Sequence, residues 1–104
     1  MATFREARSA IFKARSTLYK AYDDAPPQEQ EKIEALLHAI NREYLILLNM
    51  DPHLENASYA ALTQEFANSA ALVNEIREDA ESITHNAALI TSLVNAMGAL
   101  AVLI

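Results

Sequence analysis

Apolar residues recur at helical spacing along most of the chain, and this pattern predicts three helices. In the first, from about residue 4 to 22, large and small apolar residues alternate over three heptads: Phe4, Ala7, Ile11, Ala14, Leu18 and Ala21. Such an alternation allows another helix to approach closely. Thr3 and Glu6 have the spacing of a capping box, which predicts where this helix begins.

The second predicted helix runs from about residue 27 to 49. Pro26 and Pro27 separate it from the first helix, because proline lacks an amide hydrogen and is tolerated only in the first turn of a helix. Its apolar positions also follow helical spacing: Ile33, Leu37, Ile40, Tyr44 and Leu47. Asp51 and Pro52 predict a second break, with the Asp51 side chain capping a short turn.

The third predicted helix is long, from about residue 57 to 104, with Asn56 or Ser58 as its cap. Its three-four spacing is apolar at every position except Ser69: Tyr59, Leu62, Phe66, Ser69, Val73, Ile76, Ala80, Ile83, Ala87, Ile90, Val94, Met97, Ala101 and Ile104. A continuous helix of this length would extend for roughly 70 Å. The alternative is a break at Thr84–Asn86 that folds the last segment back and gives four helices, although neither Gly nor Pro marks it.

The end of the chain is unusually apolar, since residues 82–104 contain no Asp, Glu, Lys or Arg. In an antiparallel bundle the two shorter helices would cover the long one only up to about Ala80. Burial of one large apolar side chain contributes about 1.5–3 kcal/mol, so several exposed ones would outweigh the stability of a typical domain. We therefore expect a homo-oligomer, most simply a two-fold dimer, formed through six residues: Ile83, Ile90, Val94, Met97, Leu100 and Ile104.

Composition and charge narrow the function classes. A chain of 104 residues with one glycine and no cysteine indicates a single helical domain, without disulfides or cysteine-ligated zinc. The cysteine-free composition and the lack of a secretory signal pattern favour the cytoplasm. Residues 1–22 carry five basic residues against one acid (+4), whereas the rest carries three against thirteen (−10). A basic segment this small within an acidic protein does not favour nucleic-acid binding.

Catalytic and metal motifs do not rise above background. Glu34 with His38, and Glu81 with His85, are four positions apart, but both pairs fall on the helix faces that point away from the predicted core. Di-iron bundles need Glu and His three apart. With one glycine in the whole chain, phosphate-cradling loops are not expected. The sequence therefore predicts a protein that is not an enzyme and has no cofactor.

The favoured function is that of a helical interaction protein, such as a small adaptor, chaperone-like or regulatory module. Three aromatic residues of the first helix lie off its seam, as either a second layer of packing or an exposed docking strip: Phe12, Tyr19 and Tyr22. These three, with Leu45 and Leu48 of the second helix, are the candidates for contact with a protein partner. One alternative is a membrane-active or tail-anchored protein that inserts residues 86–104, a segment close to the length of a bilayer span. The other is an acidic antitoxin- or immunity-type protein that masks a partner.

Overall fold

The computed structural model describes residues 2–104, and these form six α-helices and one short 3-10 helix without a β-strand. The helices in chain order are α1 (Phe4–Asp24), α2 (Pro27–Leu48), the 3-10 helix η1 (Pro52–Leu54), α3 (Gln64–Ala67), α4 (Ala70–Glu78), α5 (Ala80–Ile83) and α6 (Ala87–Leu103). The predicted all-α helical bundle is confirmed.

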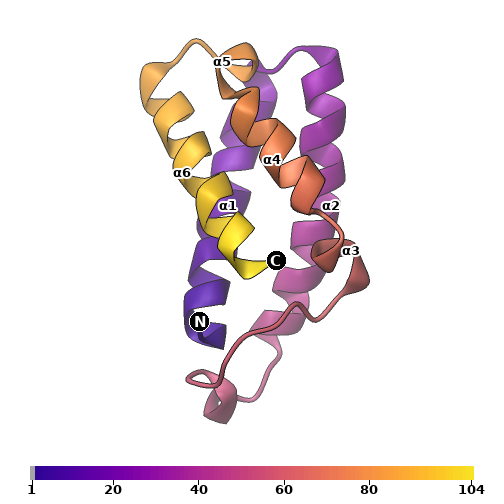
Figure 1. The fold of residues 1–104 in the computed structure, drawn as a ribbon, viewed down its shortest axis with the longest axis vertical. Helices are drawn as coiled ribbons and strands as arrows, with labels where there is room; N and C mark the ends of the chain where they lie inside the picture. Colours follow the sequence, from indigo (N-terminus) through magenta and orange to yellow (C-terminus); the bar gives the residue numbers. More distant parts are fainter. Residues whose placement is uncertain (1) are drawn as a thin grey trace.

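The four longer helices pack around one core with alternating directions (Figure 1). Helix α1 lies between α2 and α6, and α4 lies between α2 and α6 on the other side. Short helices α3 and α5 lie at the two ends of α4. The molecule is 42 Å along its longest axis, much shorter than the continuous third helix would be.

The first two helices agree with the sequence pattern to within two residues at their ends. The capping box is present, because the Thr3 side chain accepts from the Glu6 amide while the Glu6 side chain accepts from the Thr3 amide. Pro27 occupies the first position of α2. The small-and-large heptad of α1 forms its buried stripe, with no exposed area at any of five positions: Ala7, Ile11, Ala14, Leu18 and Ala21.

The prediction of one continuous helix from residue 57 to 104 is wrong. Residues 55–63 are not helical, and α3 is capped by Thr63, which accepts from the Phe66 amide, rather than by Asn56 or Ser58. This connecting segment is fixed by Glu43 of α2, whose buried carboxylate accepts hydrogen bonds from Tyr59, Leu62 and Thr63. A helix through this segment would remove those contacts, and the apolar pattern gives no sign of them.

The alternative break at Thr84–Asn86 is the correct one. Thr84 is in extended conformation, and its hydroxyl donates to Asp24 Oδ2 at 2.8 Å and accepts from the Asn86 amide. The Asn86 side chain then accepts from the Leu89 amide at 3.0 Å and caps α6. Side-chain hydrogen bonds from Thr84 and Asn86 therefore make this turn without Gly or Pro.

Because α6 folds back, the apolar end of the chain is covered by α1 and α4. Its fully buried residues are Leu93, Met97 and Leu100. The extrapolated seam through Ile90 and Val94 is only half-buried, since the break changes which face of α6 points inward. The expectation that a single copy leaves this end of the chain unburied is thus wrong.

Within residues 2–104, no helix has the length and apolarity that crossing a membrane requires.

Candidate interaction surface on helix α1

The six residues predicted to join two copies do not lie on one exposed surface. Ile83, Met97 and Leu100 are buried in the core of this chain, and Ile90 and Val94 are half-buried. Ile104 is 36% exposed. A second copy therefore has no access to three of the six in this structure.

The residues predicted to contact a partner are mostly exposed, and they lie on α1 and on the C-terminal half of α2. Phe12 and Tyr19 of α1 are 49% and 47% exposed, and Leu45 and Leu48 of α2 are 60% and 52% exposed. Tyr22 is half-buried; its hydroxyl donates to the Glu34 carboxylate, which raises the pKa of Tyr22. Tyr22 therefore already has a partner within the chain.

Phe12, Tyr19 and Tyr44 form an aromatic strip along the seam between α1 and α2. The rings of Phe12 and Tyr44 have their centroids 6.0 Å apart. The Arg15 guanidinium lies 5.2 Å from the centroid of Tyr19 and 5.6 Å from that of Tyr44, at cation–π distance from both. Each ring of the aromatic strip is thus in contact with Arg15 or with another ring of the strip.

The Arg15 side chain is itself held in place by hydrogen bonds across the seam. Its Nε donates to Asn41 Oδ1 at 2.6 Å, and Asn41 Nδ2 donates to the Tyr19 hydroxyl at 3.1 Å. Sequence reasoning identified Phe12 and Tyr19 but missed Arg15, Asn41 and Tyr44. Tyr44 belongs to the apolar stripe of α2, so its spacing indicated only a core position.

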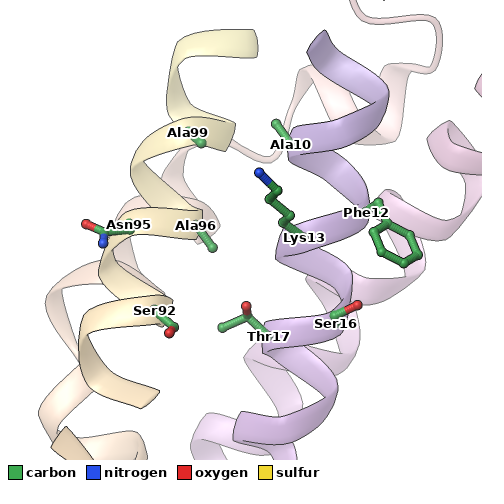
Figure 2. A pocket seen from close by; sticks show the side chains of 9 residues that line it. All are labelled: Ala10, Phe12, Lys13, Ser16, Thr17, Ser92, Asn95, Ala96 and Ala99. Atoms are coloured by element: carbon green, nitrogen blue, oxygen red, sulfur yellow. The ribbon is translucent and has the colours of Figure 1, made fainter. Parts of the chain in front are cut away.

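On the other side of α1, a groove runs between α1 and α6. We call it the α1–α6 groove; its main hollow has a volume of about 440 Å³ and is lined mostly by small side chains: Ala10, Phe12, Lys13, Ser16, Thr17, Ser92, Asn95, Ala96 and Ala99. In Figure 2, Lys13 reaches into the gap between the two helices, while Phe12 points away from α6. Phe12 also lines a smaller hollow beside Tyr44 and Leu48, so this residue of the aromatic strip borders the α1–α6 groove as well.

The α1–α6 groove continues along α1 in both directions. One adjoining hollow is lined by Arg5, Ser9 and Ala99, among others, and the other by Lys20, Leu89 and Ser92, among others. The groove therefore follows α1 from Arg5 to Lys20, which corresponds to roughly 22 Å of helix.

The basic residues of α1 differ in whether they have an acidic partner. Arg5 and Arg8 both bind the Glu55 carboxylate, at 2.7 and 2.9 Å, and this lowers the pKa of Glu55. Lys13 and Lys20 are exposed, and neither forms a salt bridge with another residue of the described chain. The positive charge beside the α1–α6 groove is thus not compensated by a salt bridge within residues 2–104.

The polar pairs considered for metal binding remain on the surface. Glu34, His38, Glu81 and His85 are all exposed. Residues 2–104 contain no group of three or more His, Cys, Asp or Glu side chains placed to hold a metal ion. The most developed surface feature is therefore the outward side of α1, with a hollow on each flank.

Comparisons with protein-family models, with curated proteins and with solved structures found no match to this chain.

Proposed function

We propose that this chain is a non-catalytic interaction protein, a small adaptor or regulatory module that binds another protein through the outward side of α1. The observation that carries the proposal is the position of Phe12. It is a large aromatic residue in the middle of a helix, 49% exposed, with a hollow on either side of it. Aromatic side chains in such settings are frequent anchors of protein interfaces.

The contacts made by the aromatic strip support the same proposal. Tyr19 and Tyr44 are held by Arg15 and Asn41, so little side-chain freedom is left to lose on binding. Leu45 and Leu48 add exposed apolar area on the neighbouring helix. Together these residues supply the apolar centre and polar surroundings that are typical of binding surfaces.

A second copy of the chain is one partner within this proposal. A homodimer would have to use residues that are exposed in one copy, such as Phe12 or Val102, which is 80% exposed. It would not be formed by Met97 or Leu100, whose contacts are inside the chain. A cytoplasmic location remains a prediction from the cysteine-free composition.

Site-specific photo-crosslinking in the cells that make the protein tests the proposal. A benzophenone amino acid replaces Phe12 in one variant and Asn74, an exposed residue of α4, in the control. We expect a discrete adduct from position 12 and none of that mass from position 74. An adduct of twice the chain mass identifies a second copy, and any other mass identifies a different protein. Equal labelling from both positions would contradict a role for α1.

A further inference from the structure

The α1–α6 groove has a shape that suits the binding of a helix. Its walls are two antiparallel helices, and apart from Lys13, which reaches into the gap, most of the residues that line it are short: Ala10, Thr17, Ser92, Ala96 and Ala99. Ser92 and Ala99 are exposed, so no part of the described chain covers them. Small side chains at a helix contact allow two backbones to approach at the short end of the usual 8–10 Å range.

Charge indicates what kind of helix would fit. Lys13 and Lys20 are seven positions apart on α1, which places them on the same side, about 10 Å apart along the axis. They line the central and one of the adjoining hollows of the groove. Two unpaired ammonium groups at this spacing favour carboxylates at positions i and i+7 of an incoming helix, which also lie about two turns apart.

We propose that the α1–α6 groove binds an amphipathic helix of a partner protein, with small apolar residues on the buried side and carboxylates seven residues apart facing Lys13 and Lys20. This inference rests on the proposed interaction function and specifies its partner. The length of the groove corresponds to a bound helix of about 15 residues.

Other occupants fit the charges less well. No helix within residues 2–104 carries two carboxylates seven positions apart, so a second copy does not supply the pattern. A nucleic acid in the groove would meet only two basic residues without a salt bridge in the described chain, Lys13 and Lys20, on a chain whose net charge is −6, which is too little positive charge for phosphate binding.

Titration of the full-length ¹⁵N-labelled chain with synthetic peptides tests the proposal. The probe is a peptide of about 18 residues, rich in Ala and Leu on one face and with two Glu seven apart; the matched peptide has Gln at both positions. We expect the Glu peptide to shift the amide signals of Lys13, Thr17, Ser92 and Ala96. We expect its affinity to exceed that of the Gln peptide by about tenfold at low salt and by less at high salt.

Three variants of the chain complete the test, each first checked for an unchanged spectrum without peptide. Lys13→Gln with Lys20→Gln should remove most of the preference for Glu. Arg42→Gln with Arg77→Gln, which changes the net charge equally at positions outside the groove, should retain it. Ala99→Leu, at an exposed position, should weaken the binding of both peptides because the larger side chain fills part of the groove.

Three results would overturn the inference: no binding of the Glu peptide, equal affinity for the two peptides, or shifts centred on Leu45 and Leu48. A failure here is distinguishable from failure of the proposed function. If a Phe12 crosslink forms while the Glu peptide does not bind, α1 is an interaction surface with a different kind of partner.

Discussion

At the scale of single residues, the most consequential side chain is Glu43, which no sequence pattern singled out. It is fully buried in α2, and its carboxylate accepts from the Tyr59 hydroxyl, the Leu62 and Thr63 amides and the Thr63 hydroxyl. Burial of Tyr59 and its hydrogen bond to Glu43 both raise the pKa of Tyr59. A single residue thus satisfies the polar groups of a loop that crosses the end of the core.

Glu43→Gln should therefore destabilise the protein without changing its surface. Gln replaces one of the two carboxylate oxygens with a donor, so at least one of the loop groups loses its acceptor. An unsatisfied buried donor costs about 1–3 kcal/mol, and we expect the free energy of unfolding, measured by urea denaturation, to fall by about that amount. Glu31→Gln, at an exposed position of the same helix, is the control and should change it little. A Glu43 variant as stable as the control would refute the anchoring role.

At the scale of elements, the segment between α2 and α3 is attached to the beginning of α1. The Phe4 amide donates to the Ala57 carbonyl at 3.0 Å, and the Tyr59 amide donates to the Ala2 carbonyl at 2.8 Å. Glu55 adds salt bridges to Arg5 and Arg8. The basic beginning of α1 is thus partly neutralised by an acid distant in sequence. Lys13 and Lys20, which line the groove, form no salt bridge within the described residues.

The attachment through Glu55 should depend on pH. Hydrogen bonds from Arg5 and Arg8 lower the pKa of Glu55 in the folded state. Its contribution is therefore fully present above the unfolded-state pKa, about 4.3, and is lost as the pH falls through the lower folded-state value. We expect Glu55→Gln to lower the melting temperature at pH 7, and the difference from the unchanged protein to shrink as the pH falls below the unfolded-state value.

Thermal melts followed by circular dichroism at several pH values would measure this difference in melting temperature. Glu81→Gln, an exposed carboxylate of α5 without a salt bridge in the described residues, provides the comparison. If the difference in melting temperature between Glu55→Gln and the unchanged protein grew on acidification, the pH dependence would be opposite to the one inferred from the lowered pKa of Glu55.

At the scale of the whole molecule, α6 completes the core rather than extending from it. Leu93, Met97 and Leu100 are fully buried between α1 and α4. At about 1.5–3 kcal/mol for each buried side chain, the three contribute roughly 5–9 kcal/mol, comparable to the total stability of a small domain.

Removal of residues 85–104 should therefore unfold the protein. We expect a chain that ends at Thr84 to lose most of its helical circular dichroism and its cooperative melting transition. The full-length variant Met97→Asp places a charge in the same core without removing the helix, and it should be severely destabilised as well. Cooperative melting of the truncated chain would show that the other helices form a stable core alone.

The sequence by itself determined the helical class, the ends of the first two helices and the residues that α1 buries. These features depend on periodicity, capping and proline positions, which act between residues close together in the chain. The same periodicity placed Phe12 and Tyr19 off the buried stripe, but it left open whether they pack in a second layer or stay exposed, and the structure shows them exposed.

Only the tertiary structure decided the course of the last 50 residues and the form of the surface on α1. An apolar three-four spacing is the same whether a helix continues or breaks and repacks, so it left the turn at Thr84–Asn86 as one of two alternatives. What selected the compact arrangement is the burial of α6 against α1 and α4, together with hydrogen bonds such as Thr84 to Asp24 and Tyr59 to Glu43. Each of these joins residues far apart in sequence, where periodicity carries no information, and the α1–α6 groove exists only once they have formed.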